Sequence, residues 1–392
     1  MVSAVITALQ EIFEEGRYAD RVIEKTLKSN KKWGSRDRAF IAESVYEIVR
    51  WYRLLYAIVG KRPRREQEWW HLFGIWKIIR GGNLPDWKEF EGLDQGRIRK
   101  QHSAVKSKRA IRESIPEWMD EMGAKQLGES WDGMLTALNR PAKVVLRTNL
   151  LKTSQQQLSD SLQKEGVVLE AISEEAFVVQ QRKNLFSTEA FKQGWFEVQD
   201  FSSQQVAHFL EVKPGMRVVD ACAGAGGKTL HLGVLMANKG QVIAMDTEAW
   251  KLKELKRRAK RNGIFIIQPK PIDSTKVIKR QKESADRLLL DVPCSGLGVL
   301  RRNPDAKWKL QPEFLEKIRG EQANIISSYS KMLKKGGKMV YATCSILPSE
   351  NQEQVQRFLE EHGEGFALEE ERSISPEEGY DGFYMARLVR KL

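Results

Sequence analysis

The stretch VVDACAGAGGKT, at residues 218–229, decides the fold of this chain. It runs from an apolar, β-branched segment into a glycine-rich turn and then into a helical pattern. This order places backbone N–H groups and a helix N-terminus beside a ligand that must approach the chain closely. A phosphate-binding P-loop would need a glycine where Cys222 stands, and the third glycine of a dinucleotide fingerprint falls on Thr229. The stretch therefore predicts a binding turn that fits neither of these phosphate-binding motifs.

From about residue 201 onward, apolar segments alternate with segments of helical period, such as 248–263 and 312–333. Because the apolar segments look buried on both sides, this alternation predicts a doubly wound, mostly parallel sheet of the Rossmann-like α/β class. In such a sheet the ligand lies outside the carboxyl ends of the strands. The predicted strands are MRVVDAC (216–222), QVIAMD (241–246), IFIIQ (264–268), RLLLDVP (287–293), KMVYATC (338–344) and FYMARLV (383–389).

Two further regions precede this one. Residues 143–200 show a β-α-β-β order that predicts a small α+β, RRM-like sheet, although the aromatic pairs of base-stacking RRMs are missing. This sheet is either an RNA-binding unit or a connecting subdomain. Residues 1–130 have the periodicity of an all-α domain, and the first 25 residues predict an amphipathic helix rather than a signal peptide. A length of 392 residues suits several domains.

The charge and cysteine content limit the function. A formal net charge of +13 favours a polyanionic partner such as RNA, because neutralising phosphates releases counterions. The basic stretch 97–112 is either a solvated helix and loop or a phosphate-contacting surface. The three cysteines lack a CxxC spacing, which argues against a disulfide scaffold or a zinc site, and we expect no metal ligands. No apolar run approaches the ~20 residues that span a bilayer, so we expect no membrane partner. We also expect the protein to be cytoplasmic and monomeric.

Aspartates stand at the ends of successive predicted strands around the glycine turn. Asp246 ends the second strand, and its carboxylate can accept both hydrogen bonds of a ribose diol. Asp273 follows the next strand and could receive an adenine amino group. Asp291 ends the fourth strand. This ordered set of acids suits a cationic nucleoside without phosphate, and it therefore predicts S-adenosyl-L-methionine as the cofactor.

Two cysteines follow the ends of neighbouring strands. Cys294 lies in DVPCSG and Cys344 in YATCSILPSEN, so both thiols should face the cleft beside the methyl donor. A thiolate that adds to carbon 6 of cytosine makes carbon 5 enamine-like, and carbon 5 can then attack the donor methyl group. Asp291 could hydrogen-bond the N3/N4 edge of the base. Two buried structural cysteines are the alternative.

Three motifs resemble those of the Sun/RsmB-type (Fmu) RNA cytosine-5 methyltransferase family, in its bacterial ribosomal RNA members. DACAGAGGKT (220–229) is similar to the family's donor loop, DVPCSGLGVLRRNPDAKW (291–308) to its proline–cysteine motif, and ATCSILPSEN (342–351) to its threonine–cysteine motif. The resemblance covers nearly the whole chain. Segments 114–154 and 198–204 resemble those that lead into the methyltransferase unit. SRDRAFIAESVYEIVRW (35–51) resembles part of a NusB-like helical RNA-binding domain, which appears abbreviated here.

The resemblance implies roles for individual residues. Cys344 would be the nucleophile and Cys294 would assist release of the product, with Asp291 as the third catalytic residue. Ala225 replaces the proline of the family's APGGK loop, and because the glycines remain we expect donor binding to persist. The implied cofactor-binding residues are Cys222, Ala223, Gly224, Ala225, Gly226, Gly227, Lys228, Asp246, Asp273 and Asp291.

The sequence therefore predicts a multidomain protein: a NusB-like RNA-binding domain (1–130), an RRM-like connector (143–200) and a Rossmann-like methyltransferase domain (201–392). We expect it to form 5-methylcytosine in 16S ribosomal RNA. The alternatives are the same reaction on tRNA, or a non-catalytic RNA-binding or ribosome assembly factor.

Overall fold

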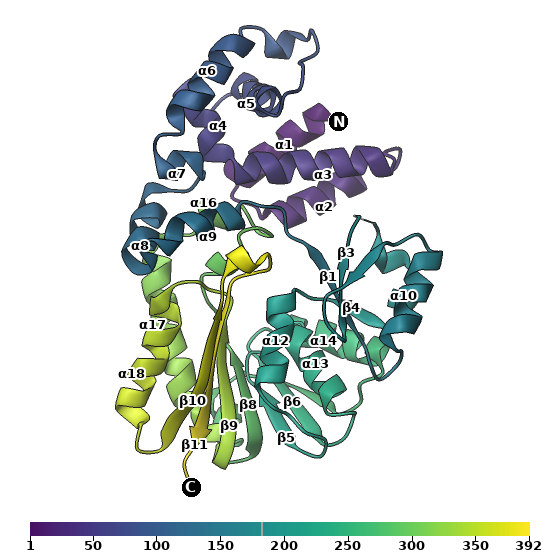
Figure 1. The fold of residues 1–392 in the computed structure, drawn as a ribbon, viewed down its shortest axis with the longest axis vertical. Coiled ribbons are helices and arrows are strands. Elements are labelled where there is room, and N and C mark those ends of the chain that lie inside the picture. Colours follow the sequence, from purple (N-terminus) through teal and green to yellow (C-terminus); the bar gives the residue numbers. More distant parts are fainter. Residues whose placement is uncertain (182) are drawn as a thin grey trace. The chain divides into compact units, whose positions relative to one another are not determined.

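The computed structural model describes residues 1–181 and 183–392, and the chain divides into two compact units (Figure 1). One unit comprises Met1–Arg140 with Leu300–Pro312, and the other comprises Pro141–Val299 with Glu313–Leu392. The segment 300–312 thus belongs with the N-terminal helices, although it follows a strand of the other unit in sequence. The three domain boundaries drawn from the sequence stay a prediction.

The second unit is built on a seven-stranded sheet in the order β10-β11-β9-β8-β5-β6-β7. Strands β5 to β9 pair in parallel, and β11 and β10 add antiparallel strands at one edge. This arrangement is the predicted Rossmann-like, mostly parallel sheet. The strands are β5 (Arg217–Asp220), β6 (Gln241–Asp246), β7 (Ile267–Pro271), β8 (Ala285–Asp291), β9 (Leu333–Thr343), β10 (Phe366–Ile374) and β11 (Phe383–Arg390).

Helices cover both faces of this sheet (Figure 1). Alternate residues of each strand point to opposite faces, so Val218 packs with helices α12 and α13, whereas Val219 packs with α17 and α18. Strands buried on both faces explain the continuous apolar runs in the sequence. The helices of this part are α12 (Phe201–Phe209), α13 (Gly227–Leu235), α14 (Ala249–Asn262), α15 (Thr275–Lys279), α17 (Pro312–Tyr329) and α18 (Gln352–His362).

Two features of the sheet differ from the sequence prediction. The strand expected at 264–268 is β7, which begins later, because Gly263 ends α14 with a φ of +68° and Ile264 packs back onto that helix. Strand β10 was not predicted. Most of its residues are exposed and many are charged, as is usual for an edge strand that must not pair with other chains, so it lacks the apolar pattern of a strand.

The connector has the predicted β-α-β-β order and forms a four-stranded sheet in the order β2-β3-β1-β4. Helix α10 begins with a capping box, in which Ser154 and Gln157 bond each other's backbone. Leu146, Leu158 and Phe196 lie in its core. The elements are β1 (Val144–Thr148), α10 (Gln155–Lys164), β2 (Leu169–Ala171), β3 (Ala176–Val179), α11 (Glu189–Lys192) and β4 (Phe196–Val198).

The other unit is helical, as predicted, although its NusB-like identity stays a prediction. The single N-terminal helix expected over the first 25 residues is two helices, because Gly16 takes a left-handed φ of +69° between them. Lys307 is buried here, and its Nζ donates to Asn139 Oδ1 at 2.6 Å. The helices are α1 (Val2–Phe13), α2 (Ala19–Ser29), α3 (Ser35–Arg50), α4 (Tyr52–Val59), α5 (Glu66–Ile79), α6 (Gln95–Val105), α7 (Arg109–Arg112), α8 (Glu117–Leu127), α9 (Ser130–Leu138) and α16 (Ala306–Lys309).

Within the described residues, the search for a helix with the length and apolar character needed to span a bilayer finds none.

Candidate active site

The glycine-rich turn between β5 and α13 has a conformation that depends on its glycines. Gly224 has a φ of +53° and Gly226 a φ of +91°, which favour glycine at both positions. A Cβ atom on Gly226 would also lie 2.7 Å from Leu255 Cγ. The turn therefore packs closely on α14 and leaves its Gly224 side open.

Asp246, at the end of β6, is fixed against this turn. Its Oδ2 accepts the N–H of Gly224 and its Oδ1 accepts the N–H of Glu248, both at 2.8 Å. Each carboxylate oxygen has a second lone pair that stays available for a ligand. The carboxylate is thus held ready beside the turn.

A cavity of about 700 Å³ opens at the carboxyl ends of the strands. Five of the predicted cofactor-binding residues line it, namely Cys222, Gly224, Asp246, Asp273 and Asp291. Ile272, Ile325 and Tyr329 add apolar surface, and Glu321 of α17 adds a carboxylate that the sequence did not suggest. The other five predicted residues belong to the same turn but are not among the described residues that line the cavity: Ala223, Ala225, Gly226, Gly227 and Lys228.

The charged lining of this cavity comprises four carboxylates, Asp246, Asp273, Asp291 and Glu321, and three lysines, Lys251, Lys279 and Lys331. Burial raises the pKa of the Cys222 thiol well above its usual value, and the neighbouring carboxylates Asp220, Asp291 and Asp246 raise it further. Burial also raises the pKa of Asp220 to about 7, against the hydrogen bond that Thr229 donates to it. The carboxylates thus gather around Cys222, at the end of the cavity beside the glycine-rich turn.

Asp291, at the end of β8, forms a partly buried ion pair with Lys228. Lys228 Nζ lies 2.6 Å from Asp291 Oδ2 and 5.0 Å from the centre of the Phe383 ring. Although burial opposes it, the Asp291 carboxylate raises the pKa of Lys228 and keeps the ammonium charged. The ion pair therefore holds the Asp291 carboxylate at the end of β8, where it lines the cavity.

The two predicted thiols lie next to each other. Cys294 follows β8 and Cys344 follows β9, and these strands are parallel neighbours, with Asp291 opposite Ala342. The two sulfur atoms are 3.3 Å apart, within hydrogen-bonding distance. This contact, followed by burial, raises the pKa of the Cys294 thiol well above its usual value. The structure thus brings both cysteines together with Asp291.

A buried carboxylate, Glu350, fastens the two cysteine loops to each other. Its oxygens accept the N–H of Ser295 at 2.7 Å and the hydroxyls of Ser295 and Ser345 at 2.5 and 2.7 Å. Gln322 of α17 donates to it at 3.1 Å and to the carbonyl of Pro293 at 2.9 Å. Since each serine directly follows one of the cysteines, Glu350 sets the distance between the thiols.

The loops also meet at Gly298, where the backbone of three segments converges. Its N–H donates to Cys344 O and its carbonyl accepts the N–H of Gly382, both at 2.9 Å. A Cβ atom there would lie 2.1 Å from Gly382 O and 2.7 Å from Cys344 O. Glycine is required at this position by close approach, not by its φ.

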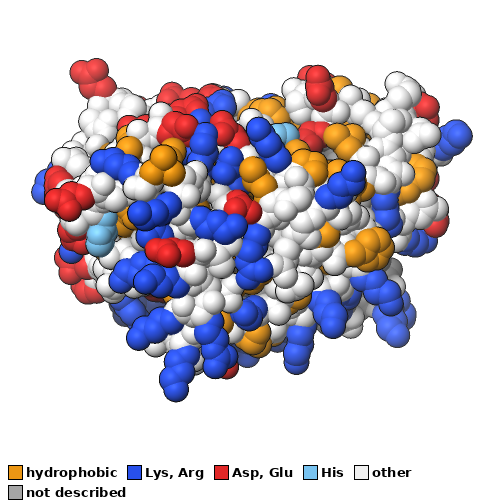
Figure 2. Space-filling view, turned by 90° about the horizontal axis from the view of Figure 1, so that it is seen from below, with side chains coloured by type: hydrophobic (Ala, Val, Ile, Leu, Met, Phe, Trp, Pro, Cys, Tyr) orange, Lys and Arg blue, Asp and Glu red, His pale blue; other side chains and the backbone are white. Residues whose placement is uncertain are grey.

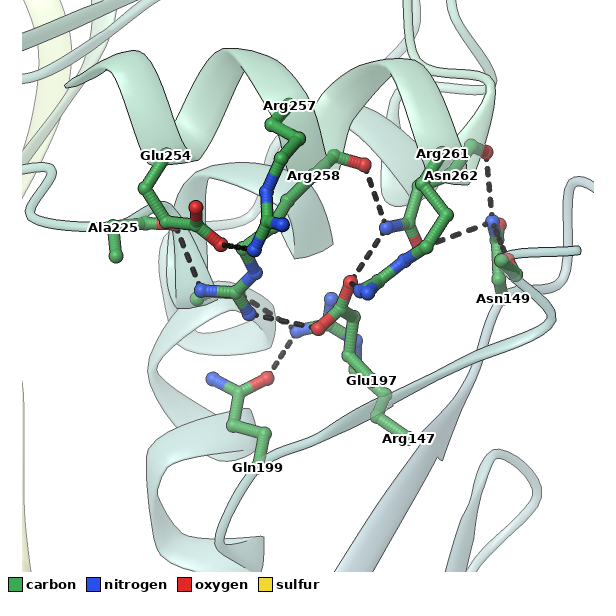
Figure 3. A network of polar contacts seen from close by, with 12 residues as sticks. Arg147, Asn149, Glu197, Gln199, Ala225, Glu254, Arg257, Arg258, Arg261 and Asn262 are labelled. Carbon is green, nitrogen blue, oxygen red and sulfur yellow. Dashed lines mark hydrogen bonds and ion pairs between the residues drawn. The ribbon is translucent and has the colours of Figure 1, made fainter. Parts of the chain in front are cut away.

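The connector supports the glycine-rich turn through a polar network (Figure 3). Arg258 of α14 donates to the carbonyl of Ala225 at 2.8 Å and to Glu197 of β4 at 2.8 Å. Arg147 of β1 donates to the carbonyl of Gly227 at 3.0 Å. These contacts hold the turn at Ala225, the position at which the Sun/RsmB-type loop has a proline. They explain how the turn can keep its conformation with an alanine there.

Sequence reasoning found the residues at the strand ends but missed this support. Glu350 stands inside the quoted ATCSILPSEN motif, and a carboxylate in a largely apolar loop was a usable signal. Glu197 interrupts the apolar strand segment WFEVQD, which likewise indicates a buried partner. Their partners lie too far away in sequence for a local pattern to reveal them.

A parallel sheet with a carboxylate-lined nucleoside cavity and a thiol pair at its strand ends defines a Rossmann-like methyltransferase. Residues 207–389 match the family model for the 16S rRNA methyltransferase RsmB/F, and residues 115–185 match the ferredoxin-like domain of RsmF/B-like methyltransferases. The chain belongs to this ribosomal RNA small subunit methyltransferase B family. The predicted Sun/RsmB-type membership is thereby confirmed, and the RRM-like connector corresponds to the ferredoxin-like domain.

Individual relatives extend over nearly the full chain. A probable ribosomal RNA small subunit methyltransferase B from Synechocystis sp. is 30% identical and covers 90% of this chain and 87% of its own. The ribosomal RNA small subunit methyltransferase B of Photorhabdus laumondii is 27% identical over 99% of this chain and 98% of its own. The crystal structure of PH0851 matches the fold with a TM-score of 0.83 at 24% identity, over 99% of this chain and 98% of that one.

Proposed function

We propose that this protein transfers a methyl group from S-adenosylmethionine to carbon 5 of a cytosine in 16S ribosomal RNA. The observation that carries the proposal is the 3.3 Å contact between the Cys294 and Cys344 sulfur atoms at strand ends that also present Asp291. A cytosine-5 transfer needs a nucleophilic thiol beside the methyl donor, and the donor cavity reaches Asp291 and Pro293.

The cavity fits S-adenosylmethionine in charge and in donor groups. When bound, this cofactor supplies a methyl group activated on a sulfonium cation. Asp246 would accept the ribose hydroxyls through its free lone pairs, and Asp273 would receive the adenine amino group. The carboxylates around Cys222 and Asp291 favour the positive charge. Within the turn, Cys222 and Gly224 line the cavity and would contact the cofactor, and the remaining residues to Lys228 would support them.

Cys344 is the nucleophile of the proposed reaction. This assignment rests on the family resemblance, and the structure contributes the 3.3 Å approach of the Cys344 and Cys294 sulfur atoms. The thiolate adds to carbon 6 of the cytosine while Asp291 hydrogen-bonds the N3/N4 edge. Once carbon 5 carries the methyl group, a base removes its hydrogen and the thiol is eliminated, which Cys294 assists. Cys294 is placed to assist because its sulfur lies 3.3 Å from that of Cys344.

Basic side chains offer surface for the RNA backbone. Figure 2 shows one face of the molecule, on which Lys and Arg side chains are spread among fewer acidic ones. In the predicted stretch 97–112, Arg97, Arg99 and Lys100 are exposed, whereas Arg109 and Arg112 are paired with acids. We expect the segment 97–108 to contact phosphates. The target base must be unstacked, at a cost of a few kcal/mol, which favours a loop or a single strand.

Two alternatives are the same reaction on tRNA and a non-catalytic role in ribosome assembly. The presence of both thiols and of Asp246, Asp273 and Asp291 favours catalysis over the second. Bisulfite sequencing of RNA from a strain without this protein, beside its parent, separates them. Loss of one protected cytosine in 16S ribosomal RNA supports the proposal, loss in tRNA supports the first alternative, and no lost site refutes catalysis on either.

Purified variants test the division of labour between the thiols. Cys344→Ser should abolish turnover and leave the affinity for S-adenosylmethionine near that of the wild type. Cys294→Ala should trap a covalent protein–RNA adduct, seen as a shifted band on a denaturing gel. Normal turnover by Cys344→Ser, or the absence of a shifted band with Cys294→Ala, would contradict the roles assigned here.

A further inference from the structure

Away from the thiols, three metal-ligating side chains converge where the connector meets the methyltransferase sheet. Glu175 directly precedes β3, whereas His208 lies on α12 and His231 on α13. One ligand atom from each residue lies within 4.8 Å of the other two. All three residues belong to the same compact unit. The fold therefore gathers one carboxylate and two imidazoles from separate segments of the chain.

Both histidines approach the same carboxylate oxygen. His208 Nε2 lies 2.6 Å and His231 Nε2 lies 3.0 Å from Glu175 Oε1. His231 has no exposed surface, and neither of its ring nitrogens has a hydrogen bond of acceptable geometry among the described residues. A buried imidazole is normally hydrogen-bonded. The ring of His231 thus points into the cluster, where its Nε2 lies 3.0 Å from Glu175 Oε1 without the alignment of a good hydrogen bond.

We propose that Glu175, His208 and His231 form a binding site for a divalent transition metal ion, of the Zn²⁺ type. A two-histidine, one-carboxylate set suits zinc, with solvent in the fourth position. Ligand atoms on a tetrahedral zinc, bonded at about 2.0–2.1 Å, lie roughly 3.3 Å apart. The 3.0 Å contact of His231 is close to that spacing. The shorter contact can lengthen because the His208 side chain is 47% exposed and free to turn.

The charges around the cluster are compatible with a bound cation. Arg147 is a buried cation that acts on His231 as well as on Glu175 and therefore opposes a second positive charge, but Glu197 and Glu175 both interact with it and offset its charge. The exposure of His208 gives the ion a route from solvent and a place for a water ligand.

The site joins the connector to the helix that starts at the glycine-rich turn. His231 stands one turn of α13 beyond Lys228, and Glu175 belongs to the connector. A metal ion would therefore tie the two together, so its binding should stabilise this unit against unfolding. It would act as a structural clamp, and the proposal does not depend on the reaction assigned above.

Zinc binding by the purified full chain tests the proposal. The chain is freed of metal by a chelator and then titrated with Zn²⁺ in competition with a chromophoric chelator. We expect one equivalent to bind and the melting temperature to rise with zinc concentration. Co²⁺ in place of Zn²⁺ should give tetrahedral absorption bands without thiolate charge-transfer bands. Thiolate bands would place the ion on the cysteines and overturn the proposal.

The His208→Ala variant keeps the test independent of folding, because His208 is the exposed ligand of the three. His208→Ala and Glu175→Gln should each weaken binding by more than the roughly 10–100-fold that loss of a ligand's supporting partner costs. His102→Ala, which removes a histidine of the helical unit, is the control and should bind as the wild type does. If the wild type binds no zinc, or if His208→Ala binds it equally well, the cluster is a hydrogen-bonded network and the proposal fails.

Discussion

Replacement of Glu350 by glutamine should uncouple the thiol pair while leaving the donor cavity intact. Glu350 is fully buried and accepts four hydrogen bonds, two of them from Ser295 and one each from Ser345 and Gln322. A hydrogen bond to a charged group contributes about 1.5–3 kcal/mol, and one between neutral groups about 0.5–1.5 kcal/mol. Because the glutamine NH2 group cannot accept, at most two of the four bonds keep their acceptor, and these two lose the charge, so Glu350→Gln should lower the free energy of unfolding by roughly 4 kcal/mol or more.

The geometry predicts a particular pattern of kinetic effects. Glu350 does not line the donor cavity among its described residues, so the affinity for S-adenosylmethionine should stay within a few-fold of the wild type. The rate of methyl transfer should fall strongly, because Ser295 and Ser345 position the neighbouring cysteines. A side chain that served stability alone would change neither quantity once the variant was folded.

Urea unfolding and single-turnover methyl transfer measure these two effects. The control is Glu353→Gln, the same substitution at an exposed position in the first turn of α18. The control should unfold at the same urea concentration as the wild type and transfer methyl groups at the same rate. If Glu350→Gln matched the control in both assays, Glu350 would not hold the cysteine loops together.

Three further substitutions test other contacts. Gly298→Ala should destabilise the fold by about 1–3 kcal/mol and slow methyl transfer, because its Cβ would meet two carbonyl oxygens. The control Gly320→Ala, whose Cβ meets nothing within 4 Å, should do neither. Equal urea midpoints for the two variants would show that a Cβ at residue 298 is not crowded. Arg258→Met should weaken donor binding several-fold, by about 1 kcal/mol, because the contacts with Ala225 and Glu197 are lost; calorimetry measures this affinity. The control Arg257→Met, on the same helix, should bind the donor as the wild type does. Equal affinities of the two variants would show that Arg258 does not support the glycine-rich turn. Burial, reinforced by Arg50, lowers the pKa of Lys307 to about 7, so between pH 7 and 10.5 the unfolded chain holds a proton that the folded chain has released. The free energy of unfolding of the wild type should therefore rise with pH, relative to that of Lys307→Met, by up to about 1.4 kcal/mol per pH unit. Parallel pH profiles of the two proteins would show that the lysine is not desolvated.

The residues at the strand ends were predictable because the local sequence shows both their chemical type and their position after a strand. Asp246, Asp291 and the two cysteines each directly follow an apolar run, and a parallel sheet brings the ends of such runs to one edge. The neighbouring placement of Cys294 and Cys344 followed from this rule, and the 3.3 Å contact confirms it. Their division into nucleophile and assisting thiol did not follow from spacing, and it remains a proposal.

The supports of the site could not be predicted, because they depend on contacts between segments far apart in sequence. Arg258 and Glu197 are separated by about sixty residues, and each alone looks like an ordinary surface charge. Strand β10 escaped prediction for the opposite reason, since its exposed charged residues erase the apolar pattern that marks the other strands.

The same supports explain how a turn with alanine in place of proline can remain organised. A proline fixes φ within the turn itself, whereas here the carbonyls of Ala225 and Gly227 are each held by an arginine from outside it. Arg147 belongs to the connector, and Arg258 is itself paired with Glu197 of the connector. The contacts of the donor turn thus run to the connector, so we expect loss of these contacts to weaken binding of the methyl donor.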